Sequence, residues 1–537
     1  MQIASRTLII VVIAAAFVAS GQALIDNELG GRRSVSLTLV SLTTVMGAVL
    51  AREPAAKFFN WINASRGRLT FRIDLALTGG ALCGLLFVAG CVLDGFPNSG
   101  DEYAFVLQAT TYAQGQVWVQ PPPLMEAFQL YHFIAKNGIW IGQYQPGWPL
   151  LLTPAVWLGL PLWVVNPVLG VALLLAVFAL ARQQASPQAG WIAVVAIACS
   201  AFFVLNAASY FSHVATALWG ILFALFGFRY LQTGEVRTAA AAGLFIGIVG
   251  FTRAFNAIIL LTPFVATLVL TKNRRSGLIW LALGGAPFLI ALLVFNHAVT
   301  GDALTMVSRW LGKEQRIIVL PNEDMIKLMI FRLEDLAAWT SPLLPIAYAF
   351  SFLYLGVRRW LSFGDLIPLL TVLAFLLYPG FGGNEYGPRY YFEAFPFAII
   401  TVTKAVDRLK FLQNGSIRLP LIASVLLSYV ACQAGYLAAR LKLEHDVVAQ
   451  RQDLFVKSRN LSNAVVLVAS STGIIRPMSQ GDLVRNGLFP SSRSVIYAHD
   501  LNEKNEDLRK IFPDRQFYRY KDGNLQLDQH LSGPEGK

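Results

Sequence analysis

Two adjacent acidic residues, Asp101 and Glu102, follow directly on a hydrophobic run that could cross a bilayer. They lie in the stretch GFPNSGDEYAFVLQATTYAQG, Gly95 to Gly115. Repulsion and partial desolvation raise the basicity of paired carboxylates, so one could accept a proton from a substrate hydroxyl while the other positions substrate or a metal. The structural alternative is that the pair only marks the polar end of a span, because acidic residues carry little topological cost outside the membrane. The pair alone does not decide between these interpretations.

The composition indicates a membrane protein with many spans. Of the 537 residues, 55% are hydrophobic and 14% are charged, and the mean hydropathy is +0.54, whereas soluble domains carry about 25% charged residues. A transmembrane helix needs about 20 mostly apolar residues, because lipid offers the backbone no hydrogen-bond partner. On this criterion we predict about thirteen spans. They are 7–24, 35–51, 74–93, 163–181, 189–206, 213–231, 238–252, 254–271, 278–298, 341–357, 363–378, 392–409 and 418–438.

The basic residues predict how these spans are oriented. The net charge of +12 comes from Lys and Arg that cluster in short loops between apolar runs, so no nucleic-acid partner is expected. The positive-inside rule assigns these loops to the cytoplasm. The N-terminus is then cytoplasmic, while the acid pair and everything after residue 440 are external. A cleaved signal peptide over residues 1–23 is the alternative for the first span. The clusters are Arg52, Lys57, Arg66, Arg68 and Arg72; Lys272, Arg274 and Arg275; Arg358 and Arg359; and Lys404, Arg408 and Lys410.

Three parts are predicted along the chain: an N-terminal accessory anchor, 1–73, a main membrane domain, 74–438, and a small external soluble domain, 440–537. The main domain carries external loops at 95–162, 296–340 and 379–392. The first loop contains PGWPLLLTPAVWLGLPLW, whose prolines interrupt helices and so predict short interfacial helices. The last part is predicted to be α/β, with β-like runs at 463–470, 494–500 and 515–523 around a helical segment at 502–512.

Four segments in this order carry a family resemblance. They are the acid pair followed by Tyr103, then NGIWIGQYQPGWPLL (137–151), GFTRAFNAIILLTP (250–263) and GGNEYGPRYYFEAFPF (382–397). Together they resemble bacterial members of the GT-C superfamily of membrane glycosyltransferases, which includes protein O-mannosyltransferases and the lipid A aminoarabinose transferase. The resemblance covers roughly residues 95–400. It implies an α-helical polytopic GT-C-like fold, with about thirteen transmembrane helices and external interfacial helices, to which the small C-terminal α/β domain is added.

The resemblance also implies a reaction. A hexosyl or pentosyl group would pass, with inversion, from a polyprenyl-phosphate sugar donor to an envelope glycan, lipid or protein acceptor. Transfer would occur at the external face of the inner membrane. Asp101 matches the family's catalytic acid, with Glu102 as its companion. The transferred sugar and the acceptor stay open, because the short C-terminal domain differs from the large soluble modules of some relatives.

A departing lipid phosphate carries negative charge and needs a cation near the membrane surface. Arg389, in GPRYY, is the first candidate, because its planar guanidinium can hold phosphate oxygens at two points. Arg253, in FTRAF, is the second. His213, at the external start of a span, could bond the donor phosphate. In the structural alternatives, the arginines extend to lipid headgroups and the histidine only packs.

Substrate contacts are predicted from the same segments. The proline-broken loop is expected to help close the site, and external aromatic residues could stack on a sugar face. Alternatives stay open, since interfacial tyrosines need no such role and Glu385 could form a structural ion pair with Arg389. The predicted substrate-binding residues are Tyr103, Tyr144, Gln145, Trp148, Glu385 and Tyr390.

No cofactor is required by this chemistry. A lipid monophosphate donor has no diphosphate for a metal to clamp, and no histidine cluster suggests zinc. A divalent cation held by Asp101 and Glu102 with substrate is possible but not indicated. The four cysteines lie in apolar runs without paired spacing, which predicts neither a disulfide framework nor a metal cluster.

Two other classes of function compete with an enzyme. A transporter or flippase of a lipid-linked or hydrophilic substrate usually places ionisable groups near the bilayer midplane and often has repeated halves. Here the ionisable groups crowd the external ends of the spans and no repeat is apparent. A catalytically inactive assembly or sensor protein that presents its C-terminal domain outside is the third possibility.

Overall fold

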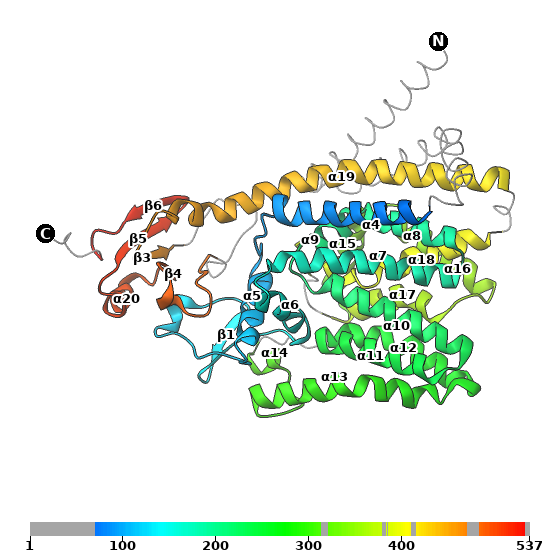
Figure 1. The fold of residues 1–537 in the computed structure, drawn as a ribbon, viewed down its shortest axis with the longest axis horizontal. Coiled ribbons are helices and arrows are strands. Elements are labelled where there is room, and N and C mark those ends of the chain that lie inside the picture. Colours follow the sequence, from blue (N-terminus) through cyan, green and yellow to red (C-terminus); the bar gives the residue numbers. More distant parts are fainter. Residues whose placement is uncertain are drawn as a thin grey trace, which may run out of the picture.

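The structure is a computed structural model that describes residues 70–312, 320–378, 383, 385–409, 415–469 and 483–531. The predicted spans 7–24 and 35–51, and nearly all of the predicted anchor 1–73, lie outside these residues. The described part is mostly helical, with a small sheet domain at its C-terminal end (Figure 1).

Each span predicted after residue 73 coincides with a helix or a broken helix. These helices are α4 (Thr70–Phe87, continued by the π-helical η1, Val88–Val92), α7 (Val165–Gln184), α8 (Pro187–Ala198), α9 (Ala201–Ala208), α10 (His213–Thr233), α11 (Val236–Thr252), α12 (Ala254–Leu270), α13 (Gly277–Thr300), α16 (Leu344–Val357), α17 (Phe363–Leu376), α18 (Phe395–Arg408) and α19 (Gly415–Ser458). A further helix, α15 (Glu323–Trp339), lies within the predicted external loop 296–340.

Only some of the described helices are individually long and apolar enough to cross a membrane. Three pass on length and composition, at Leu162–Gln184, His213–Thr233 and Lys272–Thr300. Two bent pairs, α8 with α9 (68°) and α15 with α16 (101°), raise the number to five among the described residues, and four shorter apolar helices accompany them. The chain is thus a membrane protein, and the number thirteen stays a prediction.

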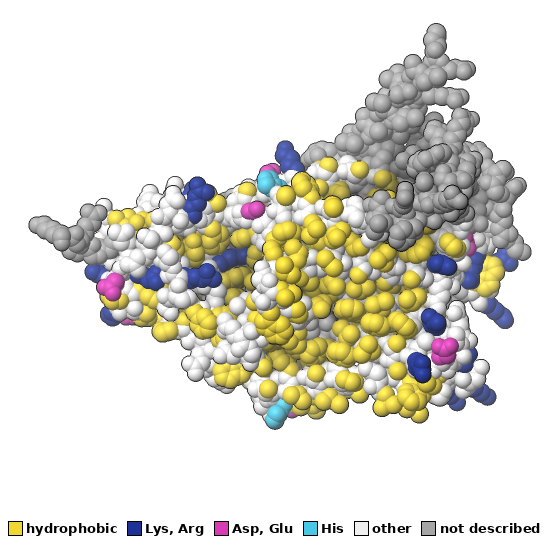
Figure 2. Space-filling model, in the orientation of Figure 1, with side chains coloured by type: hydrophobic (Ala, Val, Ile, Leu, Met, Phe, Trp, Pro, Cys, Tyr) yellow, Lys and Arg dark blue, Asp and Glu magenta, His cyan; other side chains and the backbone are white. Residues whose placement is uncertain are grey.

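The two ends of the helix bundle differ. At one end Arg274 Nε donates to the Leu231 carbonyl at 3.0 Å, and Arg408 Nη2 donates to the Gln184 carbonyl at 3.3 Å. The opposite end carries α5 (Gly100–Ala113), α6 (Gly147–Trp157) and the C-terminal domain (Figure 1). Figure 2 shows a broad hydrophobic surface between these ends, with Lys and Arg side chains at both. Basic side chains from separate loops therefore lie at one end of the bundle, while the loop that carries Asp101 and Glu102 lies at the other.

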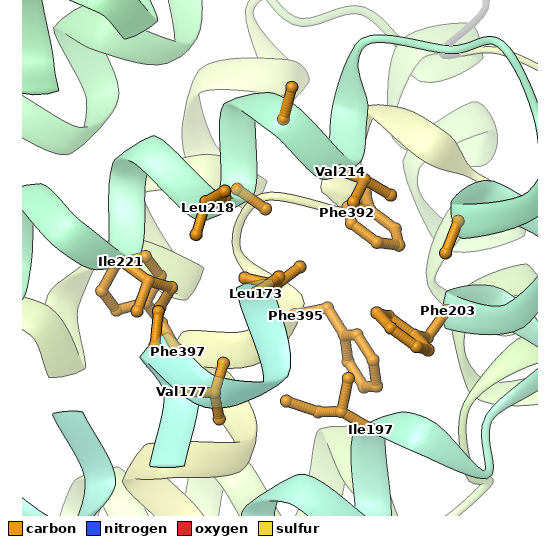
Figure 3. Close-up of a cluster of buried hydrophobic side chains, with 14 of the residues drawn as sticks. Leu173, Val177, Ile197, Phe203, Val214, Leu218, Ile221, Phe392, Phe395 and Phe397 are labelled. Carbon is orange, nitrogen blue, oxygen red and sulfur yellow. The ribbon is translucent and has the colours of Figure 1, made fainter. Parts of the chain in front are cut away.

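One hydrophobic core joins the helices that carry the site. Leu173 and Val177 of α7 pack with Val214, Leu218 and Ile221 of α10 (Figure 3). Phenylalanines from the start of α18 complete the cluster, and each of these side chains is at most 9% exposed. Apolar burial of this kind stabilises by about 25 cal/mol per Å². It fixes the first turn of α10 against the segment before α18, and both segments carry candidate site residues.

The C-terminal domain is a four-stranded sheet in the order β4-β3-β5-β6. β3 (Ala464–Val468), β4 (Val495–His499), β5 (Gln516–Lys521) and α20 (Asn505–Ile511) coincide with the β-like and helical runs expected from the sequence. β3 pairs in parallel with β4 and β5, whereas β6 (Asn524–Leu527) pairs antiparallel with β5. The β5–β6 turn is Asp522-Gly523, both at positive φ, as a two-residue hairpin requires.

Helix α19 connects the two parts. At 44 residues it is about 66 Å long, twice the thickness of a bilayer core. It runs beside η1, α8 and α9 and then out to the sheet (Figure 1). The hydrophobic run ends near residue 438, but the helix continues to Ser458 because the polar residues that follow are good helix formers.

Candidate active site

The acid pair opens helix α5. Ser99 caps this helix, its hydroxyl accepting from the Glu102 backbone N–H at 3.3 Å. Carboxylates in a first turn also interact favourably with the helix dipole. Because consecutive helical residues point about 100° apart, the side chains of Asp101 and Glu102 enter different surroundings.

Asp101 lies at the centre of a polar cluster. The Tyr144 hydroxyl donates to Oδ1, Arg389 Nη2 lies 3.2 Å from Oδ2, and His132 Nε2 lies 3.7 Å from Oδ1. The Asp101 side chain is still 20% exposed. Burial alone would raise its pKa, but Arg389 and then His132 and Tyr144 outweigh this and hold the pKa below its usual value. Asp101 is therefore ionised at neutral pH and can accept a proton.

Glu102 points away from that cluster and is completely buried. Its Oε1 accepts from the Tyr210 backbone N–H at 2.9 Å, and its Oε2 accepts from the Ser99 hydroxyl at 3.2 Å. Burial raises its pKa to about 7, although the Tyr210 hydrogen bond opposes the shift. Glu102 thus anchors α5 to the segment before α10.

Arg389 comes from the short 3-10 turn Arg389–Tyr391 (η5), in GPRYY. Its guanidinium lies over the Phe211 ring at 3.7 Å, and the residue is 7% exposed. Gly383, at a φ of +76°, permits this placement, since a Cβ there would lie 2.6 Å from Arg389 Cγ. The buried Nη1 has no hydrogen-bond partner within the described residues. An unsatisfied buried donor is unfavourable, which is consistent with an acceptor oxygen supplied by a ligand.

A second buried cluster surrounds Glu393. His213 Nδ1 lies 3.0 Å and Arg253 Nε 3.4 Å from Glu393 Oε1. Arg253 occupies the break between α11 and α12, and its guanidinium lies 5.4 Å from the centroid of the Tyr390 ring. The structure therefore brings Arg253 and His213, which were predicted to bind the donor phosphate, together with Tyr390, which was predicted to bind substrate.

Two predicted residues of the proline-broken loop make structural contacts. Gln145 Oε1 accepts from the Ala254 backbone N–H at 2.9 Å, next to Arg253 at the start of α12. Trp148 is 1% exposed, and its indole donates to the Tyr210 carbonyl at 2.7 Å. These bonds hold the loop against α12 and against the segment that carries Tyr210. Their predicted contact with substrate stays a prediction.

Tyr103 and Glu385 face toward the C-terminal part of the chain. The Tyr103 hydroxyl accepts from the Gly487 backbone N–H at 2.9 Å. Glu385 Oε1 lies 3.3 Å from Arg451 Nη2 on α19, and Arg451 also donates to the Asn98 carbonyl. The loop that carries Arg389 is thereby tied to the residues just before α5 and to α19.

Four residues that lie in or beside the site were not predicted from the sequence: His132, Tyr210, Glu393 and Arg451. His132 lies just before strand β1 (Phe133–Lys136), which forms a hairpin with β2 (Ile139–Gly142) through Asn137-Gly138. An Asn-Gly pair between apolar strands is a strong hairpin signal and could have revealed this turn. Glu393 was hidden inside the predicted span 392–409, although it lies only four residues after the predicted phosphate ligand Arg389.

The described part of the chain holds no group of three or more His, Cys, Asp or Glu side chains that could bind a metal ion. The candidate site consists of a carboxylate and a guanidinium in contact, with a second cation and a histidine nearby. Such an arrangement can remove a proton and stabilise a departing anion.

No protein-family model and no curated protein sequence matches the chain. Solved structures match its fold. The crystal structure of ArnT from Cupriavidus metallidurans in the apo state aligns with 88% of this chain and 100% of its own, at a TM-score of 0.54 and 13% identity. The crystal structure of ArnT from the same organism bound to undecaprenyl phosphate aligns with 87% of this chain and 100% of its own, at a TM-score of 0.56 and 10% identity. The chain therefore has the GT-C fold, which confirms the fold expected from its motifs.

Proposed function

We propose that this protein is an integral membrane glycosyltransferase that moves a sugar from a polyprenyl-phosphate donor to an envelope acceptor. The observation that carries the proposal is the contact between Asp101 and Arg389, a carboxylate beside a guanidinium at one end of the helix bundle. The binding of undecaprenyl phosphate by ArnT, a protein with the same fold, supports a lipid-phosphate donor.

The transfer is a single displacement. The acceptor hydroxyl oxygen forms a bond to the anomeric carbon of the sugar, and the bond from that carbon to the phosphate oxygen breaks. The hydroxyl proton passes to Asp101, and the lipid phosphate leaves with the bonding electron pair. General-base catalysis of this kind contributes about 10²- to 10⁴-fold. One displacement inverts the anomeric configuration.

Arg389 has two roles in this scheme. Before the donor binds, it pairs with Asp101 and holds the pKa of that carboxyl down. When the donor phosphate accepts from the unsatisfied Nη1, it takes part of the guanidinium charge from Asp101. Asp101 then becomes more basic as the leaving group is stabilised, so donor binding itself prepares the base.

The second cluster completes the donor site. Arg253 adds a cation whose side chain is 21% exposed, and Glu393 fixes its direction. His213 can donate to a phosphate oxygen, with Tyr390 close by. Because these residues lie at the same end of the bundle as Asp101, the lipid tail would run along the apolar flank of the helices while its sugar stays in water. By the positive-inside rule this end is external and the C-terminal domain is outside the inner membrane.

The decisive experiment compares wild type with Asp101→Asn purified from native membranes, with co-purifying lipids identified by mass spectrometry. We expect the variant to retain or enrich a polyprenyl-phosphate sugar, because donor binding persists while transfer stops. Glu126→Gln, which alters an exposed acid of the same external loop, serves as the control and should resemble wild type. If neither protein holds such a lipid and Asp101→Asn restores every envelope glycan in a deletion strain, the proposal fails in favour of a transporter or scaffold.

A further inference from the structure

A cavity of about 610 Å³ lies between α5 and the C-terminal domain. Tyr103, Leu107 and Thr110 of α5 form one wall, together with Gln114 directly after the helix. The other wall comes from residues 485–497, which lead into strand β4. Ligand sites typically measure about 300 to 1,000 Å³, so this cavity is large enough for one or two sugar rings.

The charge of the lining selects for anions. Arg485 and Arg493 both line the cavity, and among its described lining residues there is no Asp or Glu. Figure 2 shows further Lys and Arg side chains on the C-terminal domain. Guanidinium groups bind phosphate and carboxylate oxygens with paired hydrogen bonds, so Arg493, with Arg485 beside it in the lining, fits one anionic group.

Both arginines are held in place. Arg485 stacks over the rings of Phe96, at 4.2 Å, and Tyr103, at 4.8 Å. Arg493 Nε donates to the Asn486 carbonyl at 2.9 Å, while within the described residues its two terminal nitrogens form no hydrogen bond. The Arg493 guanidinium is thus oriented through its Nε, while its terminal nitrogens can donate to a ligand.

Aromatic residues share the cavity with these cations. Tyr103, Phe489 and Tyr497 all line it, and Phe489 is 51% exposed despite its size. Aromatic rings beside a few fixed polar groups are typical of sites for organic ligands. The lining therefore fits a molecule that joins an anionic group to a ring.

The cavity also lies close to the proposed base. Asp101 and Tyr103 are two residues apart on α5, which separates them by about 3 Å along the helix axis and places them on opposite sides of the helix. A helix is about 10 to 12 Å across. A ligand that extends from the cavity around the start of α5 by that distance reaches Asp101.

We propose that this cavity binds the acceptor through an anionic group, a phosphate or a carboxylate, carried on a sugar ring. The inference rests on the proposed glycosyl transfer and names the class of acceptor. The cavity holds the anionic end while the hydroxyl to be glycosylated lies at Asp101. The C-terminal domain then has a defined role, since it supplies both arginines.

Binding is tested with the full chain in nanodiscs of neutral phosphatidylcholine, by calorimetry with glucose 1-phosphate and with glucose. Wild type should bind the phosphate and not the neutral sugar. Arg493→Gln should weaken that binding about tenfold or more, since it removes hydrogen bonds between charged groups. The control Arg509→Gln, an arginine on α20 outside the cavity, should bind like wild type. No binding by wild type, or equal binding by Arg493→Gln, overturns the proposal.

Two further arms separate this site from its alternatives. In membranes, Arg493→Gln should keep the polyprenyl-phosphate sugar yet raise the acceptor KM, whereas failure of the proposed function itself would remove that lipid from every variant. In nanodiscs that contain phosphatidylglycerol, an Arg493-dependent rise in Tm without any effect of glucose 1-phosphate would identify a lipid headgroup site and overturn the acceptor assignment.

Discussion

Arg389 Nη2 and Asp101 Oδ2 lie 3.2 Å apart, although 288 residues separate them in the chain. The contact joins the first turn of α5 to the turn that precedes α18. It keeps Asp101 ionised, and in the part of the chain that the structure describes Arg389 Nη1 has no hydrogen-bond partner. In the proposed mechanism, a donor phosphate would bind Arg389 either in place of Asp101 or at Nη1 while the pair persists.

Substitution of Arg389 should affect both donor binding and transfer. Arg389→Gln removes the cation and should lower the transfer rate about 10²- to 10³-fold, the cost of losing one oxyanion donor. Arg389→Lys keeps the charge but loses the planar fork, so its loss should be smaller. The measurement is transfer of a radiolabelled sugar in membranes, with Arg459→Gln, an exposed arginine at the end of α19, as control. Equal activity of all three variants would exclude a role for Arg389 at the phosphate.

Tyr144 should tune the base. Tyr144→Phe removes the hydrogen bond donated to Asp101 and so raises the pKa of that carboxyl toward its usual value. The acidic limb of the pH profile of kcat/KM should then move to higher pH, while the rate at neutral pH should not fall, because Asp101 stays ionised there and becomes the stronger base. Tyr131→Phe is the matched control, because it keeps the edge contact with His132 and removes the hydroxyl of a residue that is 56% exposed. If the acidic limb stays in place while the rate falls, Tyr144 contacts substrate and does not tune Asp101.

The fold was largely readable from the sequence because lipid imposes a simple rule. Each apolar run between residues 74 and 438 became a helix, since a spanning backbone must satisfy its own hydrogen bonds. The number of spans was harder to predict. Ser200 caps α9 immediately after α8 ends and so bends one predicted span, which composition does not reveal.

The site was predictable only where a motif carried it. The family resemblance assigned the segments that carry Asp101 and Arg389 to one site. Their neighbours did not, because His132 and Glu393 owe their positions to a hairpin and to a turn that bring distant parts of the chain together. Asp101 and Glu102 are adjacent in the sequence but do not share one environment, because the helix directs Glu102 toward Tyr210 and away from the Asp101 cluster.

Gly147 should be intolerant of any side chain. A Cβ at this position would lie 2.5 Å from Thr252 Oγ1 and 2.7 Å from the Phe251 carbonyl oxygen of α11. Gly147→Ala must therefore push α6 away from α11, which costs about 1–3 kcal/mol and displaces the neighbouring Tyr144. We expect a lower Tm and at least about tenfold less transfer. Gly250→Ala is the control, since its Cβ would meet only Ala257 at 3.6 Å. A Gly147→Ala protein with unchanged Tm and activity would contradict this packing.

Glu102 should affect stability more than catalysis, and the effect should depend on pH. Its pKa is raised from the usual 4.5 to about 7, so the folded protein holds a proton that the unfolded chain releases, and stability falls as pH rises through this window. Glu102→Gln can preserve both hydrogen bonds without a charge. It should therefore match wild type at pH 5 and exceed it above pH 7, by at most about 3 kcal/mol. The pKa of Asp101 is lowered, so its contribution to stability is lost only as the pH falls below the usual Asp pKa of 3.8. Asp101 therefore does not change the stability between pH 5 and pH 8.5. The measurement is Tm in nanodiscs from pH 5 to pH 8.5, with transfer activity assayed in parallel. Parallel Tm curves would disprove the buried proton, and complete loss of transfer at every pH would make Glu102 a direct participant in the reaction.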